Sequence, residues 1–317
     1  MVEISPRPPA QLAKIAVKRV AVLLNPRAGA FKRTKAADIG RALRTTFARN
    51  NVRADIEVMD SEDLHDTAKR ARAQAERDEI DAVVIGGGDG SMRVAASVLA
   101  GTGIPLGLIP LGTANHFAKD LGLPLQLKEA AAVIASGHSR VVDVAEVNGE
   151  TFINNSSIGI YPYMVIDRER RRARHKLAKW MAMVPAFFHM LHHFPRRRLR
   201  ICAEGFERPY RTPCLFVGNN KYAMELFTLR RRQRLDGGKL WFYVVKPREP
   251  LQFFWMVCRL CFGRMDQKRD LDTFELAEAE VNAKTSRFPV ALDGDVRIMH
   301  APLRYRSRPG ALRVIAP

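Results

Sequence analysis

The chain has 317 residues, with 52 Lys and Arg against 33 Asp and Glu, a formal net charge of +19, and 47% hydrophobic residues. That hydrophobic share is typical of a globular protein, and the length suggests two domains or one large one. Collagen-like, coiled-coil and low-complexity chains are excluded, because the sequence shows no glycine period, heptad run or biased tract. Residues 1–160 hold 20 basic and 18 acidic side chains, and residues 161–317 hold 32 and 15. We therefore expect the second half to meet an anionic partner, which could be nucleic acid, an anionic membrane or a phosphorylated ligand.

The cysteines and the apolar stretches bear on the cellular compartment. All four cysteines lie in apolar surroundings of the second half, which indicates a reducing compartment. Cys258 and Cys261 form a lone CxxC pair, more typical of buried structural thiols than of a zinc site. The N-terminal segment lacks the apolar core of a secretory signal, and no stretch reaches the roughly 18 apolar residues that span a bilayer. These features predict a cytoplasmic protein, peripherally associated with the inner face of the membrane.

The first half alternates strands and helices, the pattern of a parallel sheet with right-handed crossovers. Short, continuous apolar runs predict its buried strands at 18–25, 55–59, 81–85 and 105–110. Helices are predicted up to residue 50, over 61–77, from the third strand to 99, and at 116–121 and 127–136.

After residue 140 the pattern changes to strands separated by turns, which predicts a mainly antiparallel, sandwich-like sheet structure. These strands are predicted at 141–147, 151–155, 199–203, 212–218, 240–245, 272–281, 290–292 and, in pieces, 303–314. A helical insertion is predicted over 164–194. The fold class is thus an α/β domain, 1–140, followed by a β-rich domain, 141–317, whose last strand can return to the first domain.

The strongest motif is a glycine-rich loop between the third strand and the next helix. Residues 83–91 read VVIGGGDGS. Successive glycines let the backbone approach a phosphate, and the amides at the helix start favour negative charge. Asp89 fits such a loop if it meets the phosphates through Mg²⁺ or holds the loop from behind, and Ser91 can donate to phosphate or cap the helix. The alternative is an ordinary turn, but the strand before and the helix after favour phosphate binding.

Two further loops end parallel strands. Residues 25–29 read NPRAG after the first strand, and residues 112–115 read GTAN after the fourth. Open α/β sheets bind ligands at the carboxyl ends of their strands. Each loop alone could be a structural turn, but together they place Asn25, Thr113 and Asn115 around one crevice.

These three loops resemble the catalytic domain shared by bacterial diacylglycerol kinases, sphingosine kinases and ceramide kinases. The resemblance extends over most of the chain, through VDV at 142–144, FINNSSIG at 152–159 and LDGG at 235–238. It implies an ATP-binding α/β domain, a β-rich lipid-binding domain and an active site between them. The ATP-binding residues it implies are Asn25, Gly86, Gly87, Gly88, Gly90, Ser91, Thr113 and Asn115. NAD kinases share a GGDG[ST] loop, but GTANHFAKDLGLP at 112–124 resembles the lipid kinases more closely, with His116 at the family's usual Asp position.

The resemblance also assigns the carboxylates. The family's general base lies in a DGE segment, and this chain has Asp293-Gly294-Asp295, so Asp295 is the implied base and Asp293 the second candidate. A tight turn between strands is the alternative reading of this segment. Asp89 is implied to act through Mg²⁺. The family often has a structural Mg²⁺ site at an LDDG turn, of which Asp236 remains here as a candidate metal ligand.

A basic segment precedes a predicted apolar helix face. Residues 167–179 read DRERRRARHKLAK. Apolar residues then follow at helical spacing: Leu177, Trp180, Met181, Val184, Phe188 and Leu191. This pattern suits an interfacial helix on anionic lipid, with 196–198 and 230–234 on the same face. A helix packed on the core, with solvated arginines, is the alternative.

These residues predict an ATP- and Mg²⁺-dependent lipid kinase, with diacylglycerol as the default acceptor. A sphingoid base or ceramide kinase, an NAD kinase-like enzyme and a catalytically silent lipid- or nucleotide-binding relative are the alternatives. The expected partners are a lipid substrate and an anionic membrane surface, and a homodimer stays open. Nucleic acid is not expected, because the sequence has no aromatic RNP stretch, zinc finger or recognition helix.

Overall fold

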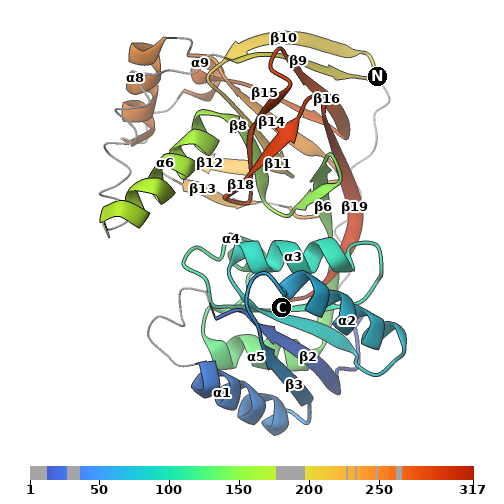
Figure 1. The fold of residues 1–317 in the computed structure, drawn as a ribbon. Helices are drawn as coiled ribbons and strands as arrows, with labels where there is room; N and C mark the ends of the chain where they lie inside the picture. Colours follow the sequence, from blue (N-terminus) through green and yellow to red (C-terminus); the bar gives the residue numbers. More distant parts are fainter. Residues whose placement is uncertain are drawn as a thin grey trace. The chain divides into compact units, whose positions relative to one another are not determined.

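The computed structural model describes residues 13–26, 36–175, 197–225, 228–232, 234–247, 249–261 and 266–317. The chain divides into two compact units. The first contains residues up to Val144 together with 234–238 and 308–317, and the second contains 145–233 and 239–307. The predicted fold class is confirmed, since one unit is α/β with a mainly parallel sheet and the other is built from antiparallel sheet (Figure 1).

The first unit is built on a parallel sheet with the strand order β19, β5, β4, β2, β3. Its strands are β2 (Arg19–Leu24), β3 (Arg53–Val58), β4 (Ala82–Gly87), β5 (Leu106–Pro110) and the end of β19 (Leu303–Ile315). The three central strands are buried along nearly their whole length, because helices cover both faces of the sheet. Their short apolar runs therefore reflect a position inside a doubly covered sheet.

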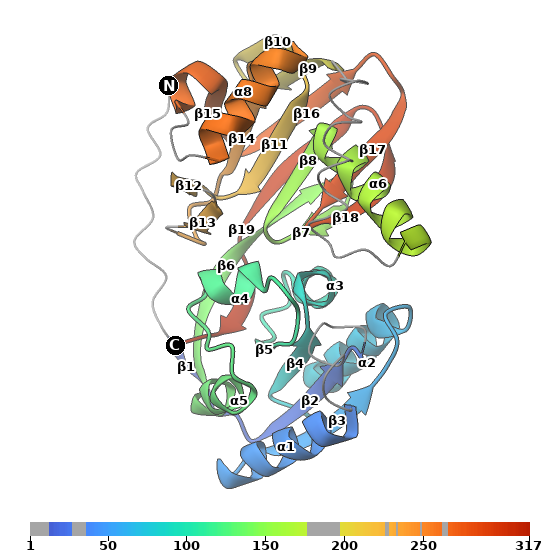
Figure 2. The same cartoon turned by 90° about the vertical axis from the view of Figure 1, so that its left-hand side faces the viewer.

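The helices lie in pairs on the two faces of this sheet (Figure 2). Helix α1 (Ala36–Arg49) packs against α5 (Leu127–Ser136), and α2 (Leu64–Glu76) packs against α3 (Asp89–Leu99). In α1 the buried residues Ile39, Leu43 and Phe47 recur every fourth position, which gives one apolar face. The short helix α4 (His116–Asp120) follows β5. Strand β1 (Ala13–Lys14) pairs with the start of β6 (His138–Val147).

Asp143, on β6, joins segments of the first unit that are far apart in the sequence. Its carboxylate accepts hydrogen bonds from the backbone N–H groups of Gly238, at 2.6 Å, and Gly310, at 2.8 Å. Its own N–H donates to the carbonyl of Leu235 at 2.7 Å, and the residue is 2% exposed. These bonds bring 234–238 and 308–317 into the first unit, which also contains residues 141–144.

The second unit is a sandwich of two antiparallel sheets. One sheet runs β15 (Leu271–Leu276), β14 (Leu240–Val245), β11 (Cys214–Asn219), β8 (Asn155–Gly159), β17 (Arg287–Leu292) and β18 (Asp295–His300). The other runs β10 (Phe206–Thr212), β9 (Arg197–Ala203), β16 (Glu278–Ala283) and the start of β19. The end of β6 also pairs with β7 (Glu150–Phe152). The two sheets are held together by one apolar core between them.

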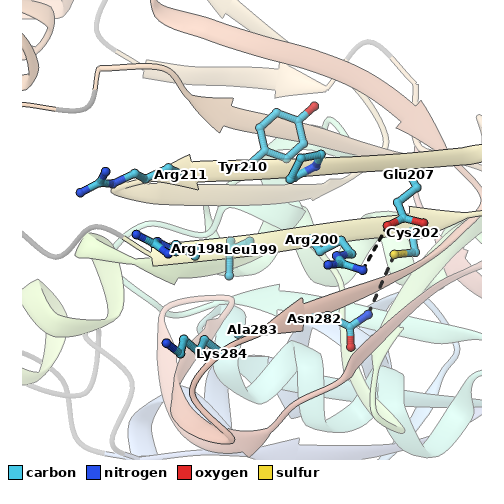
Figure 3. Close-up of a pocket in the computed structure, with 11 residues that line it drawn as sticks. Arg198, Leu199, Arg200, Cys202, Glu207, Tyr210, Arg211, Asn282, Ala283 and Lys284 are labelled. Carbon is cyan, nitrogen blue, oxygen red and sulfur yellow. Dashed lines mark hydrogen bonds and ion pairs between the residues drawn. The ribbon is translucent and has the colours of Figure 1, made fainter.

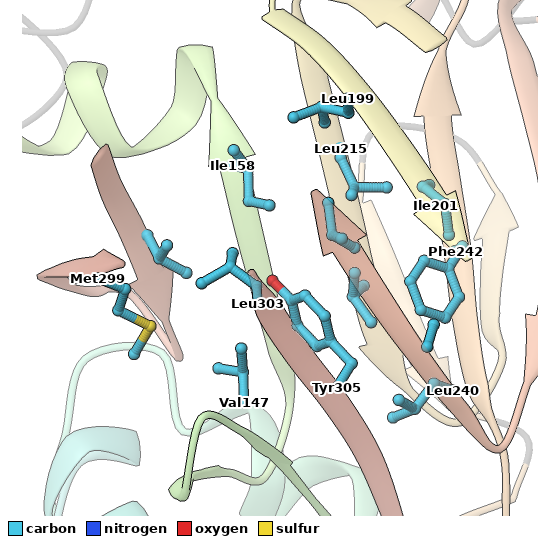
Figure 4. Packing of buried hydrophobic residues seen from close by; sticks show 14 of the residues in the cluster. Val147, Ile158, Leu199, Ile201, Leu215, Leu240, Phe242, Met299, Leu303 and Tyr305 are labelled. Carbon is cyan, nitrogen blue, oxygen red and sulfur yellow. The ribbon is translucent and has the colours of Figure 1, made fainter. Parts of the chain in front are cut away.

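That core contains side chains from both sheets, including Ile201, Leu215 and Phe242 (Figure 4). Tyr305 lies among them, 1% exposed, with its ring edge-on to Phe242. Burial raises the pKa of this phenol, and its hydroxyl is satisfied by a 3.0 Å hydrogen bond with Ser156 Oγ. A polar group in this core is thus tolerated because it is paired.

The remaining elements lie outside the two sheets. They are α6 (Ile160–His175), α8 (Pro250–Cys261), α9 (Gln267–Asp270) and a hairpin of β12 (Tyr222–Glu225) and β13 (Thr228–Arg232). The helical insertion predicted over 164–194 starts earlier, at Ile160. Its predicted apolar face, Leu177 to Leu191, lies outside the described residues. None of the helices in the described part of the chain is both long enough and apolar enough to cross a membrane.

Besides the short strands β1, β12 and β13, sequence reasoning missed β10 and β18. Both are edge strands with exposed polar side chains, and β10 also contains Pro209. Proline is tolerated at a sheet edge, where its missing N–H leaves no ladder bond unmade, so the sequence signal for a strand is weak there. The strand predicted over 151–155 is two strands, the one predicted over 272–281 breaks at Ala277, and the last segment, predicted in pieces, is the single strand β19.

Asp143→Asn tests the junction in the first unit. An amide offers only one acceptor oxygen to the two N–H donors, so a buried donor loses its partner, and we expect the free energy of unfolding to fall by about 2 kcal/mol. Urea unfolding of both proteins measures the difference. The control is Asp55→Asn, at an exposed position on β3, with an expected change below about 0.5 kcal/mol. Equal stability of the two variants would contradict the assigned role of Asp143.

Candidate functional site

The glycine-rich loop lies at the carboxyl end of β4 and continues directly into α3. Gly88 is the N-cap residue of that helix, and no side-chain capping bond is made there. The first N–H groups of a helix have no partner within the helix, and they carry its positive end. Gly88 and Gly90 are half-buried, so this helix start is accessible. The arrangement suits an anion held by backbone amides.

Gly86 and Gly87 differ from Gly88 in what their missing side chains allow. Both are buried residues of β4. A Cβ at Gly86 would stand 2.4 Å from Cδ2 of Leu24, and one at Gly87 would stand 2.5 Å from Cβ and Oγ of Ser91. The first two glycines therefore let neighbouring side chains pack against the strand, which a sequence-level phosphate motif does not reveal.

Gly88 and Gly112 bring two loops into backbone contact. A Cβ on Gly112 would stand 2.5 Å from Cα of Gly88, and one on Gly88 would stand 3.3 Å from Cα of Gly112. The Gly112 loop is closed by Asn115, whose side chain accepts from the Gly112 N–H and donates to its carbonyl, both at 2.9 Å. Asn115 has a positive φ of 51° and is 5% exposed, while Thr113 lies exposed in the same loop.

Asp89 ties the glycine loop to the start of α4. Its two carboxylate oxygens accept hydrogen bonds from the backbone N–H groups of His116, at 3.1 Å, and Phe117, at 3.0 Å. Such charge-assisted bonds satisfy two of the donors that a helix start leaves open. His116 contributes only its main chain here, so a histidine at the family's usual Asp position leaves this contact unchanged.

Asn25 connects the ends of three elements. Its Nδ2 donates to Oγ of Ser61 at 3.0 Å and to Oγ of Ser91 at 2.9 Å, and its N–H donates to the carbonyl of Gly86 at 2.9 Å. Asn25 and Ser91 are each 7% exposed. The structure therefore brings the three predicted loops of the first unit together. Many of the polar side chains in these loops form the hydrogen bonds that hold the loops in place. The rest of the 25–29 motif, residues 27–29, lies outside the described residues.

Asp293 and Asp295 lie at a hairpin turn of the second unit, between β17 and β18. Asp293 and Gly294 have positive φ values of 49° and 91°, and Leu292 pairs with Asp295 across the turn. A two-residue connection of this kind matches the twist of the flanking strands, so the tight turn weighed in the sequence reading is present. Asp295 follows the turn and is exposed.

Asp293 has a different environment from Asp295. Its carboxylate accepts three backbone hydrogen bonds, from Ile153 at 2.8 Å, Asn154 at 2.8 Å and Asn155 at 3.0 Å. These bonds fix the 153–155 segment, which connects β7 to β8. The two aspartates of the DGD segment therefore differ in their surroundings. The carboxylate of Asp293 binds the main chain, and Asp295 lies at the surface.

Arg232 is a buried cation that the sequence reading placed in an exposed basic cluster, 230–234. It is 4% exposed, and its guanidinium donates to the carbonyls of Ile153, at 2.6 Å, and Asn219, at 3.0 Å. It also donates to Oδ1 of Asn154 at 2.9 Å. Arg232 is therefore not part of a surface that could touch lipid. It supports the same segment that Asp293 holds.

The described residues offer few candidates for a protein-built metal site. Asp236, in the first unit, accepts a hydrogen bond from Nε of Arg234 at 3.0 Å, which raises the pKa of that guanidinium. In the part of the chain that the structure describes, no group of three His, Cys, Asp or Glu side chains gathers to hold a metal. Cys258 of the CxxC pair is a free, half-buried thiol, and the side chain of Cys261 is not described.

The sequence profile of the diacylglycerol kinase catalytic domain matches residues 19–147, a stretch that contains all three loops of the first unit. The resemblance noted in the sequence is confirmed.

Individual relatives extend the comparison. A diacylglycerol kinase of Mycobacterium tuberculosis (strain ATCC 25618 / H37Rv) is 36% identical over 144 residues, which cover 45% of this chain and 45% of that relative. A Yersinia pestis (strain Pestoides F) protein named "Probable lipid kinase YegS-like" is 36% identical over 99 residues, 30% of this chain and 33% of that relative. The matched part therefore spans less than half the length of these curated relatives. A crystal structure of a diacylglycerol kinase from Bacillus anthracis str. Sterne has a TM-score of 0.73 at 22% identity, covering 96% of this chain and 99% of that one, so the fold is shared throughout.

Some residues of the family's catalytic domain and its neighbour escaped the sequence reading. Asp143 lies in the VDV motif, to which the sequence assigned no role. Its carboxylate binds the amides of Gly238 and Gly310. The only signal for this in the sequence is the pair of glycines in the LDGG segment. The pairing of Asn25 with Ser61 had no signal, because the two residues are 36 positions apart and only the sheet brings them together.

Gly112→Ala tests the contact between the two loops. Its Cβ would meet backbone atoms that cannot rotate away, so we expect the free energy of unfolding to fall by about 1–3 kcal/mol. The control is Gly40→Ala in α1, where the nearest atom to the new Cβ is 4.0 Å away. That variant should gain about 0.5–1 kcal/mol from better helix propensity. Urea unfolding measures both, and a Gly112→Ala protein as stable as the original would refute the contact.

Proposed function

We propose that the protein is an ATP- and Mg²⁺-dependent lipid kinase that transfers the γ-phosphate of ATP to a lipid hydroxyl, most simply that of diacylglycerol. The observation that carries this proposal is the uncapped start of α3 beside Gly88 and Gly112, within a stretch that matches the diacylglycerol kinase catalytic domain. The curated relatives carry the names of diacylglycerol and lipid kinases, which supports the choice of substrate class.

The triphosphate is assigned to the main chain of the glycine loop. Gly88 and Gly90 would donate backbone N–H groups to phosphate oxygens, and Thr113 could add its exposed hydroxyl. Asn25, Ser91, Asn115 and Asp89 would keep the three loops at the right distance. Phosphoryl transfer depends mainly on positioning and charge stabilisation, so rigid loops contribute directly to rate.

Mg²⁺ fits this arrangement as a partner of the nucleotide. In phosphate sites it usually keeps several waters and uses only one or two carboxylates beside the phosphates. Asp89 is the carboxylate of this loop, and carboxylate oxygens are the protein ligands that Mg²⁺ uses beside phosphates. The ion would neutralise charge on the β- and γ-phosphates.

Asp295 is proposed as the general base. The hydroxyl oxygen of the lipid bonds to the γ-phosphorus while the bond from that phosphorus to the β,γ-bridging oxygen breaks. The hydroxyl proton passes to the carboxylate of Asp295, and ADP leaves with the bonding electron pair. Asp295 is preferred to Asp293 because it is exposed, whereas Asp293 is engaged by three backbone donors.

Transfer of ³²P from γ-labelled ATP into a total lipid extract, with and without Mg²⁺, tests the function. We expect one Mg²⁺-dependent labelled lipid that comigrates with phosphatidate. A label on a sphingoid base or ceramide would reassign the acceptor, and formation of NADP from NAD would indicate the NAD kinase-like alternative. No labelled product from any of these acceptors would favour a catalytically silent relative.

Asp295→Asn separates chemistry from folding. We expect turnover to fall by about 10²-fold or more because the proton acceptor is lost, with unchanged affinity for ATP and unchanged thermal stability. Asp293→Asn should instead lower the melting temperature, because the amide keeps only one acceptor oxygen for the three backbone donors, Ile153, Asn154 and Asn155. Steady-state kinetics and thermal unfolding of both variants measure this. If Asp293→Asn were inactive but stable, and Asp295→Asn active, the two roles would be reversed.

A further inference from the structure

The outer face of one sheet of the second unit carries a row of three cations. Arg211 on β10 lies directly opposite Arg198 on β9. On the other side of β9, Leu199 lies opposite Ala283 of β16, so the next residue, Lys284, continues that register toward Arg198. Neighbouring strands are about 4.8 Å apart, so the three residues form a short row across the strands. All three are exposed, and Figure 3 shows their side chains at the same end of a groove on this face.

The row has no internal compensation for its charge. Among the residues that the structure describes, the side chains of Arg198, Arg211 and Lys284 make no ion pair or hydrogen bond. Arg200, one pair further along β9, is different, because its Nη1 lies 3.3 Å from Oε1 of Glu207. Like charges directly opposite each other destabilise a sheet. An anion bound across the row would relieve this repulsion.

The groove has a volume of about 800 Å³, and the charge is balanced differently at its two ends. Behind the cationic row, Arg200 lies between Pro209 and Asn282. The next row places Cys202 between two carboxylates, Glu207 and Glu280. Both carboxylates pair with arginines, Glu207 with Arg200 and Glu280 with Arg304. The uncompensated charge is therefore that of the cationic row, to which a negatively charged group is drawn. Arginine forks bind phosphate oxygens in pairs, which makes phosphate the chemistry that suits this end.

We propose that Arg211, Arg198 and Lys284 bind the phosphate groups of anionic phospholipids and dock the chain on a bilayer surface. The choice of a bilayer rests on the proposed function, since a lipid kinase finds its acceptor in a membrane. Nucleic acid is the weaker candidate, because binding sites on DNA commonly neutralise about 6–10 phosphates and this row offers three cations. Basic residues near an anionic leaflet contribute one by one, so three suffice for a measurable effect. This row shares no residue with the basic segment 167–179.

The test is sedimentation of the full chain with vesicles of phosphatidylcholine alone, or of phosphatidylcholine and phosphatidylglycerol in a two-to-one ratio. The test variant is the triple substitution R198Q/R211Q/K284Q. The control is R77Q/K239Q/R306Q, which removes the same charge from cations that pair with Glu79, Glu275 and Glu278. We expect the test variant to bind the anionic vesicles at least about tenfold more weakly and the control to change less than about twofold. Binding of the original chain should weaken as salt is raised.

The outcomes separate this proposal from its rivals. Equal losses in the two variants would show a net-charge effect and overturn the site, as would unchanged binding of the test variant. Full competition by glycerol phosphate at the same phosphate concentration would indicate a soluble ligand instead of a bilayer. Tighter binding to a DNA duplex than to vesicles, lost in the test variant, would reassign the row to nucleic acid.

Two further measurements keep the result independent of folding and of the proposed reaction. The test variant should be at least as heat-stable as the original chain at low salt, because the repulsion is gone. All three proteins should phosphorylate a short-chain diacylglycerol in neutral detergent micelles at the same rate. Absence of turnover in all three proteins would contradict the proposed kinase activity. The docking site would then be judged from the vesicle binding alone.

Discussion

Two loops of the first unit are in direct main-chain contact, at glycines that leave no room for a side chain. Gly88 and Gly112 approach so closely that a methyl group on Gly112 would lie 2.5 Å from Cα of Gly88, well inside van der Waals contact distance. Asp89 then fixes the same pair of loops from the other direction, through the amides at the start of α4. The helix start that is proposed to hold phosphate is therefore positioned by main-chain contact and one carboxylate. The polar side chains of Asn25, Ser91, Asn115 and Asp89 are engaged with one another or with the main chain.

The elements of the first unit could be predicted almost completely from the sequence. Continuous apolar runs bounded by turn residues indicate strands covered on both faces, and they give β2, β4 and β5 to within two residues. The second unit was harder. Its edge strands β10 and β18 carry polar side chains toward solvent, so they lack the hydrophobic signal on which strand prediction depends. Burial of Arg232 could not be foreseen either, because a cation inside a run of arginines looks like any solvated one.

The functional motifs were predicted as residue types and not as roles. A run of glycines indicates that another group lies close to the main chain. It does not show whether that group is a bound phosphate or a side chain such as leucine or serine. In the structure, the side chain of Leu24 packs against Gly86, and the side chain of Ser91 packs against Gly87. In the same way, DGD specifies both a hairpin turn and a carboxylate, and only the hydrogen bonds of Asp293 show which aspartate holds the 153–155 segment. Long-range hydrogen bonds carry this information, and single sequences do not display them.

The strand β19 has a consequence for how this chain can be divided into fragments. Its first residues pair with β16 in the second unit, and Val314, near its end, pairs with Leu106 in the first. The stretch that matches the catalytic domain profile ends at residue 147, well before this strand and before Gly238 and Gly310. A fragment cut at that point would expose the edge of β5 and bury the carboxylate of Asp143 without its donors. The stretch that matches the catalytic domain profile is thus smaller than the first compact unit. Two segments that complete this unit, 234–238 and 308–317, come later in the chain.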